Sequence, residues 1–223
     1  MTYQTLIQDI QSYLERGTEE DTIVFNQIPR LINMAERRLG RELKILGAQM
    51  SVTAVMTPGV PIIQKPTGWR EDISIFIGTT AVKDDNTGVI SYTAGTSRVP
   101  IFPRVYEYLR SFWPNEASRD TPKFYANMGM KHWIFAPTPD DAYPLEITYF
   151  ATPEFLGEDN QTNWITDNYP QLLLYGTLME ASPFLKDDSR VQVWQTMYSQ
   201  AMQDIITDNK SNIKDRSIER DTP

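Results

Sequence analysis

The chain contains no cysteine, and its only histidine is His132. The first absence excludes disulfides, thiolate zinc sites, iron–sulfur clusters and cysteine nucleophiles. The single histidine leaves one imidazole for catalysis. Packing among the apolar residues of KHWIFA explains His132 better than a catalytic role does. The GxxxxGK[ST], GxGxxG and GxSxG motifs are also absent, and AGTSR lacks the second glycine of the last motif. Nucleotide hydrolysis and α/β-hydrolase chemistry are therefore not indicated.

Neither charge nor hydropathy points to nucleic acid or to a membrane. The 223 residues carry a formal net charge of −8, which does not favour a broad basic face for non-specific binding of nucleic acid. No run approaches the roughly 20 apolar residues that cross a bilayer. The start MTYQTLIQDIQSYLERG lacks the basic end and apolar core of a signal peptide. We therefore expect a soluble intracellular protein with no membrane partner.

Helical periodicity marks the N-terminal end of the chain. In residues 3–14 apolar side chains fall on one helical face, and Gly17 follows where a helix would stop. In residues 21–43 apolar side chains recur every three or four positions. Pro29 is expected in the first turn of this second helix or at a kink, because its missing N–H is harmless only at a helix start.

Helical periodicity returns near the C-terminal end. Asp167 or Asn168 is placed to cap a helix that has Pro170 in its first turn. Ser182-Pro183 is expected to end or bend that helix. A second apolar stripe follows KDDSR and continues to about residue 207. The two segments predict an αα-hairpin with a large buried surface.

Short β-branched runs broken by proline and glycine replace the helical period in residues 49–155. Strands are predicted at MSVTAVM, VPIIQK, ISIFIGTTAV and GVISYTAG, with a tight hairpin at KDDNTG. VYEYLRSFW is predicted to be a short helix. Residues 122–151 follow as strand, turn, strand and strand, with PTPDDAYP as a hairpin loop and Leu145, Ile147 and Tyr149 on one face.

This order of elements predicts an α+β fold. Helices within residues 3–45 and 168–207 are expected to form one helical bundle, with the β-rich region 49–155 inserted between them. Residues 1–207 would then be a single domain. Residues 208–223 mix charges of both signs and have few apolar anchors, so we expect a flexible tail that a partner can order.

Two acidic patterns admit a metal site, and a simpler role explains each. The loop DDNTG at residues 84–88 resembles part of a calcium loop, but the glycine spacing and the distal glutamate are absent, which favours a hairpin turn. The pairs Glu158-Asp159 and Asp187-Asp188 are able to hold Mg²⁺ for phosphodiester chemistry. Both pairs lie beside predicted helix starts, where carboxylates cap the helix and favour its dipole.

Aromatic residues are abundant along the whole chain. A stacking platform for single strands or sugars would use them, but such a platform usually comes with a basic groove that this composition does not favour. Core packing and subunit contact are the better explanation. The residues concerned are Tyr106, Tyr108, Trp113, Phe124, Tyr125, Trp133, Tyr149, Trp164, Tyr169, Tyr175, Trp194 and Tyr198.

Three segments in a fixed order carry a family resemblance. They are FNQIPRLINMAERRLGREL, then TPKFYANMGMKHWIFAPTPDDAYPLEITYFATPEFL, then NWITDNYPQLLLYGTLMEASPFLKDDSRVQVWQTMYSQAMQDI. Over roughly residues 3–207 the chain resembles the head-to-tail connector proteins of tailed bacteriophages, the adaptors called tail tubular protein A or gatekeeper. The most specific positions are Tyr149, Pro153, Asp167, Tyr169, Pro170, Leu172, Leu173, Leu174, Tyr175, Gly176, Glu180, Ala181, Trp194 and Tyr198.

The resemblance implies a structural role without enzymatic activity and without a cofactor. Connector proteins assemble as a ring, commonly twelvefold, beneath the portal protein, and they extend the channel through which the genome is packaged and ejected. They also present the surface on which the tail tube or nozzle docks. The protein would then reside at the head–tail junction of the virion, and in the host cytoplasm during assembly. An acidic chain suits a conduit through which DNA passes without specific binding.

A closed ring of identical subunits needs two different complementary faces on each subunit. Arg37, Arg38 and Arg41, expected to face solvent on their helix, are candidates to meet acidic residues of the adjacent copy, although a solvated charged face explains them equally well. The resemblance also implies that the polar tail orders against the portal or a neighbouring subunit. The candidate contacts there are Ile213, Arg216 and Ile218.

Two other classes of function remain open from the sequence. One is a Mg²⁺-dependent phosphodiesterase using Glu158, Asp159 or Asp187, which predicts metal binding and loss of activity on exchange of Asp for Asn. The other is a glycan-binding tail module using exposed aromatic residues, which predicts quenching of tryptophan fluorescence by sugars. Neither has a convergent motif in this sequence.

The tail prediction is directly testable. Deletion of residues 208–223 is expected to leave the melting temperature nearly unchanged, because few apolar side chains are removed, and to weaken docking to the portal protein. Thermal unfolding and a portal-binding assay measure the two effects. A large fall in melting temperature would show that the segment belongs to the folded domain.

Overall fold

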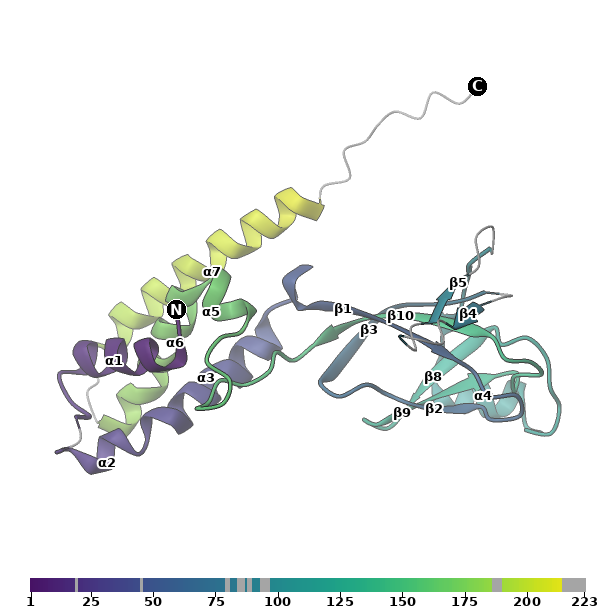
Figure 1. Cartoon of the computed structure of the whole chain (residues 1–223), viewed down its shortest axis with the longest axis horizontal. Coiled ribbons are helices and arrows are strands. Elements are labelled where there is room, and N and C mark those ends of the chain that lie inside the picture. Colours follow the sequence, from purple (N-terminus) through teal and green to yellow (C-terminus); the bar gives the residue numbers. More distant parts are fainter. Residues whose placement is uncertain are drawn as a thin grey trace, which may run out of the picture. The chain divides into compact units, whose positions relative to one another are not determined.

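A computed structural model provides the structure of the chain (Figure 1). It describes residues 1–18, 20–44, 46–78, 81–83, 87, 90–92, 97–185 and 190–213.

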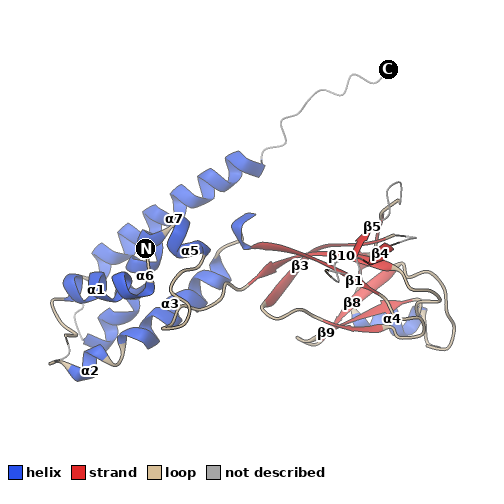
Figure 2. Cartoon of the chain, in the orientation of Figure 1, coloured by secondary structure: helices blue, strands red, loops and turns tan. Residues whose placement is uncertain are grey.

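The chain divides into two compact units. The helical unit comprises Met1–Ala48 and Thr152–Pro223, and the β unit comprises Gln49–Ala151. The chain thus leaves the helical unit once and returns to it. Helices lie at both ends of the sequence and strands lie in the middle, which confirms the mixed α and β class (Figure 2).

The N-terminal helices follow the predicted boundaries closely. α1 (Tyr3–Leu14) begins with a capping box at Thr2. The chain then turns through Gly17, whose φ of +83° favours glycine, and a Cβ there would lie 3.0 Å from the side chain of Ile28. The run predicted as one helix over residues 21–43 contains two, α2 (Thr22–Phe25) and α3 (Ile28–Glu42).

α3 confirms the place of the proline in this run. Pro29 lies at the first turn of α3, where its missing N–H has no intrahelical partner to lose. A short 3₁₀ turn, η1 (Leu46–Ala48), follows and leads into the first strand.

The C-terminal helices depart from the predicted boundaries in three places. Asp167 and Asn168 do not cap the long helix, because they belong to a separate short helix, α5 (Trp164–Asn168), capped by Asn163. α6 (Pro170–Leu185) does not end at Ser182-Pro183 but continues two residues past Pro183. The Ser182 hydroxyl donates to the carbonyl of Leu178 at 2.9 Å.

The third departure is the end of the last helix. α7 (Val191–Ile213) extends six residues past the predicted end at residue 207. Polar residues can extend a helix into solvent without a buried apolar face. Hydrophobic periodicity therefore does not predict such an extension. Ile205 is the last fully buried residue among the described side chains of α7.

α6 lies at the centre of the helical unit. Its buried residues point in all directions around the axis, so α6 must be covered on every side. α1, α3, α5 and α7 all contact it, and apolar residues from both ends of the chain share one core. At Gly176 an added Cβ would lie 3.3 Å from the ring of Tyr198 and 3.6 Å from Ala35, which shows how closely the helices approach.

A buried carboxylate joins α3 to the chain returning from the β unit. The Glu36 side chain is 0 % exposed, and both of its oxygens accept from the backbone N–H of Leu156, at 3.1 and 3.2 Å. The amide of Asn163, the cap of α5, donates to the same carboxylate at 2.9 Å. Burial raises the pKa of Glu36 to about 7, against the opposing effect of these hydrogen bonds and of Arg37.

The β unit is built from two four-stranded sheets. One sheet has the order β1-β10-β3-β6, formed by β1 (Gln49–Val55), β10 (Pro144–Ala151), β3 (Trp69–Ile77) and β6 (Val99–Pro100), with antiparallel pairs throughout. The other has the order β2-β9-β8-β7, formed by β2 (Ile62–Gln64), β9 (His132–Ala136), β8 (Phe124–Met128) and β7 (Phe102–Pro103), in which β7 and β8 are parallel.

The core of the β unit contains residues from both sheets. Leu145, Ile147 and Tyr149 of β10 are buried, as their alternation predicts, and they pack in one cluster with Trp133 and Phe135 of β9. One prediction was wrong here. The segment PTPDDAYP is not a hairpin loop, because β9 and β10 belong to different sheets and the segment connects one sheet to the other.

Two smaller elements complete the β unit. β4 (Ala81–Lys83) and β5 (Ile90–Tyr92) pair antiparallel, as the hairpin prediction requires, while the turn residues of KDDNTG at 84–86 and 88 lie outside the described residues. The predicted short helix is confirmed as α4 (Tyr106–Phe112).

Glu36 makes the stability of the helical unit depend on pH. An unfolded glutamate has a pKa near 4.5 and the folded one has a pKa of about 7, so between these values the unfolded chain releases a proton that the folded chain keeps. The free energy of unfolding should therefore fall by about 3 kcal/mol as the pH rises through this window. Glu36→Gln keeps an acceptor for Leu156 and Asn163 but cannot titrate.

Denaturant unfolding of both proteins at about pH 5 and about pH 8 tests this prediction. The difference between wild type and Glu36→Gln should shift in favour of the variant at the higher pH. An equal change in both proteins would contradict it.

Candidate docking surface

α4 has one buried face and one exposed face. The Leu109 side chain is 2 % exposed and packs on a small apolar cluster with Ala126, Ile134 and Ala136 of strands β8 and β9. A helix of seven residues on the outside of a sheet can bury only one face, so the apolar residues on its other face remain at the surface.

The exposed face of α4 is aromatic. Tyr108 and Phe112 stack with ring centroids 5.8 Å apart, and both rings meet Phe124 of β8 edge to face, at 5.9 and 5.7 Å. Phe112 is 50 % exposed. Val105, the N-cap residue, and Phe102, which pairs with Phe124 in the β7–β8 register, are also exposed. We call these five residues the α4 aromatic surface.

Arg104 adds a positive charge to the α4 aromatic surface. Its guanidinium carbon lies 5.2 Å from the ring centroid of Phe124 and 5.7 Å from that of Tyr108, while Nη1 donates to the carbonyl of Pro103 at 2.9 Å. A cation over an exposed ring contributes about 0.5–1 kcal/mol. Arginine and aromatic side chains are enriched at the energetic centres of protein–protein interfaces, so this composition is typical of a docking surface.

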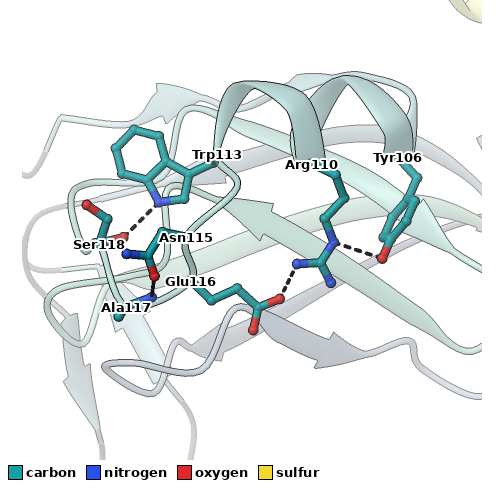
Figure 3. Close-up of polar contacts among 7 residues, drawn as sticks. All are labelled: Tyr106, Arg110, Trp113, Asn115, Glu116, Ala117 and Ser118. Atoms are coloured by element: carbon teal, nitrogen blue, oxygen red, sulfur yellow. Dashed lines mark hydrogen bonds and ion pairs between the residues drawn. The ribbon is translucent and has the colours of Figure 1, made fainter.

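Polar contacts fix α4 and the loop that follows it (Figure 3). Arg110 donates from Nε to the Tyr106 hydroxyl at 2.8 Å and forms an ion pair with Glu116 of the loop. These partners raise the pKa of Arg110. The Trp113 indole donates to the carbonyl of Ser118 at 2.7 Å. The aromatic residues are therefore displayed on a braced segment, which lowers the ordering cost of binding a partner.

An apolar groove continues the α4 aromatic surface. It has a volume of about 390 Å³, and Phe102 and Phe124 belong to its wall. Val99, Pro122 and Tyr143 line it further. A ring or aliphatic side chain of a partner can enter such a groove, whereas the flat rings beside it offer only a contact surface.

A second concavity of about 520 Å³ lies at Trp69, Asp72, Tyr125 and Asn127. The Asp72 carboxylate accepts from the indoles of Trp69 and Trp133 at 2.8 and 2.9 Å. Burial raises the pKa of Tyr125, and the charge of Asp72 raises it further. The Asp72 carboxylate therefore already accepts two hydrogen bonds from indole groups.

Lys65 is buried and contacts two residues of that wall, Trp69 and Asn127. Its Nζ lies 3.3 Å from the ring centroid of Trp69 and donates to Asn127 Oδ1 at 2.7 Å and to the carbonyl of Gly129 at 3.2 Å. Burial lowers the pKa of Lys65. These contacts satisfy the buried ammonium group.

The candidate catalytic and metal residues are dispersed. His132 is partly buried at the start of β9. Glu158 and Asp159 are exposed in the segment before α5, and Asp187 and Asp188 lie outside the described residues. Within the described ranges, no group of three or more His, Cys, Asp or Glu side chains is arranged to hold a metal ion. In the same ranges no helix is long and apolar enough to cross a membrane.

The three candidate arginines of α3 have different surroundings. Arg37 is exposed, donates to Asn33 Oδ1 at 2.8 Å and lies 4.7 Å over the ring of Phe155. Arg41 is exposed near the end of the helix. Arg38 is only partly exposed, because it lies to one side of the outward face and pairs with Glu180 of α6 at 2.5 Å.

The candidate tail residues lie at or beyond the last described position. Ile213 is the final residue of α7, and Arg216 and Ile218 fall outside the described residues. Their contacts with a portal or a neighbouring subunit stay predictions.

The sequence pattern indicates some of the aromatic residues of α4 but does not reveal the surface they form. Tyr108 and Phe124 were assigned to core packing or subunit contact, while Arg104, Val105 and Phe112 were not singled out. A signal was present in the sequence, because Tyr108 and Phe112 are four residues apart on a segment too short to bury two faces. The contribution of β8 depends on strand order, which local pattern does not reveal.

The two faces of α4 should respond differently to truncation. Leu109→Ala removes a buried side chain and should cost about 2–4 kcal/mol in the free energy of unfolding. Phe112→Ala removes mainly ring contacts at the surface and should cost about 1 kcal/mol. Denaturant unfolding measures both values. Equal costs would show that the aromatic face is part of the folded core.

Comparison with known proteins identifies the family. The model of the SU10 adaptor protein family matches residues 1–220, so the chain belongs to this family of phage head–tail adaptors. The head-to-tail connector resemblance found in the sequence is thereby confirmed. A search of curated proteins found no match to the chain.

Proposed function

We propose that this member of the SU10 adaptor protein family forms a ring, twelvefold in the commonest arrangement, between the portal and the tail of a phage. In this proposal the helical unit and the β unit act as one connector subunit, and the ring extends the channel for packaging and ejection. The protein is then a structural component of the virion at the head–tail junction, present in the host cytoplasm during assembly, with no enzymatic role.

The docking part of the proposal rests on the α4 aromatic surface. It combines exposed rings, a guanidinium group and an adjoining apolar groove on a braced helix. An adaptor needs a surface that binds another protein, and this composition matches the centre of a protein–protein interface. We assign the tail tube or nozzle protein to this surface.

The portal contact is assigned to the other end of the chain. Ile213 ends α7, and Arg216 and Ile218 follow in the C-terminal segment. An ordered helix leading into a short polar segment with few apolar anchors suits a sequence that orders on a partner. DNA is expected to pass through the lumen without specific binding, in keeping with the net charge of −8.

The exposed rings also favour a second candidate, binding of a glycan by a tail module. Sugars stack on exposed aromatic faces as protein side chains do. Trp113 lies 6.2 Å from the ring of Phe112, so a bound sugar should change tryptophan fluorescence. The phosphodiesterase alternative has no comparable support, because Glu158 and Asp159 are exposed without a third carboxylate grouped beside them among the described residues.

The docking assignment predicts a selective binding defect. Val105→Ser combined with Phe112→Ser should weaken binding to the tail component by at least about tenfold, since buried aromatic anchors are typically worth 1.4 kcal/mol or more. Binding to the portal should be unchanged. The matched control is Ile73→Ser with Met130→Ser, which removes exposed apolar side chains elsewhere in the β unit.

Pulldown of purified portal and tail components by each variant measures both interactions, and fluorescence titration with sugars tests the glycan alternative. Equal tail binding by wild type, variant and control would overturn the assignment. Sugar-dependent quenching that the variant loses would favour the glycan-binding role.

A further inference from the structure

The outward face of α3 carries a basic stripe. Arg30, Met34, Arg37 and Arg41 are spaced at four, three and four residues, which places them on one line opposite the buried side of the helix. All four are exposed. We call them the α3 stripe. Three arginines on one face of a protein with a net charge of −8 form a local surface of the opposite sign.

The outer face of α7 carries a complementary stripe. Val193, Met197, Asp204 and Asp208 are exposed and lie on one side of the helix, at spacings of four, seven and four residues. We call them the α7 stripe. Its apolar members come first along the helix and its acidic members follow.

A groove borders the acidic end of the α7 stripe. It has a volume of about 350 Å³ and lies between α7 and the start of α6, with Asp204 and Asp208 among its lining residues. Tyr169, Leu172 and Ile205 form apolar parts of its wall. Such a groove accepts the aliphatic stem of an arginine while carboxylates at the rim meet its guanidinium group.

The geometry of the two stripes suits a ring. α3 and α7 both pack against α6 and run in the same direction within the helical unit (Figure 1). Copies related by rotation about an axis along these helices keep that direction, so α3 of one copy meets α7 of the next in parallel. Arg37 and Arg41 are then able to face Asp204 and Asp208 together, because the members of each pair are four residues apart, about 6 Å along the helix axis.

We propose that the α3 stripe of one copy docks on the α7 stripe of the next copy. This inference rests on the proposed ring and specifies which faces of the subunit join. The occupant of each stripe is a second copy of this chain because the two surfaces differ and are opposite in charge. A head-to-tail contact of this kind closes only by rotation, as a ring requires.

Charge exchange tests the pairing. One variant combines Arg37→Glu with Arg41→Glu, a second combines Asp204→Arg with Asp208→Arg, and a third carries all four substitutions. The control combines Asp9→Arg with Glu158→Arg, which changes the net charge as much as the second variant does, at exposed positions elsewhere in the helical unit. Thermal unfolding checks that each variant is folded.

The readout is the number of chains bound to the purified portal, by mass measurement and electron microscopy. The first two variants should lose ring assembly by at least about tenfold, because like charges then face each other, and the third should regain it. The control should assemble like wild type. Rings formed equally well by the first two variants, or no recovery in a folded third variant, would overturn the pairing.

The same experiment separates this inference from the proposed function. Wild-type chains that bind the portal as a ring, with single exchanges that have no effect, would leave the connector function standing and reject only the pairing. Wild-type chains that do not associate with the portal would reject both. Loss of DNA retention in the first variant with normal rings would assign the α3 stripe to nucleic acid and reject the pairing.

Discussion

The requirement to cover α6 on every side determines how this chain is built. A helix that is apolar all around its axis is stable in water only when neighbouring helices enclose it, and here those neighbours come from both ends of the sequence. The chain must therefore return to the helical unit after completing the β unit. Glu36 of α3 binds the returning chain by accepting hydrogen bonds from Leu156 and Asn163. Burial at this site disfavours the charged form of Glu36 and so raises its pKa.

That arrangement gives each unit a distinct set of exposed features. In the helical unit, enclosing α6 leaves the outer faces of α3 and α7 exposed, and these faces carry charges of opposite sign. In the β unit, the short helix α4 buries Leu109 and displays aromatic residues on its other side. Membership in a family of head–tail adaptors gives these exposed features a common interpretation, because an adaptor acts through the proteins it contacts.

Local sequence pattern predicts the elements of this fold better than their connections. Helical spacing located α1, α3 and α4, and alternation identified the buried face of β10, because these signals come from neighbours along the chain. The separate helix α5 was missed because Asp167 and Asn168 are equally suited to a cap and to a short helix. The segment between β9 and β10 was taken for a hairpin, since turn residues do not show which sheet the next strand joins. Arg38 illustrates the same limit, because only the tertiary structure brings it to Glu180.

The most direct test of the adaptor account is electron cryomicroscopy of the head–tail junction in the phage that contains this chain. The account predicts a closed ring of copies between the portal and the first tail component, with the helical and β units each recognisable in every subunit. A junction in which portal and tail meet without this chain, or a virion in which the chain occupies another position, would contradict it.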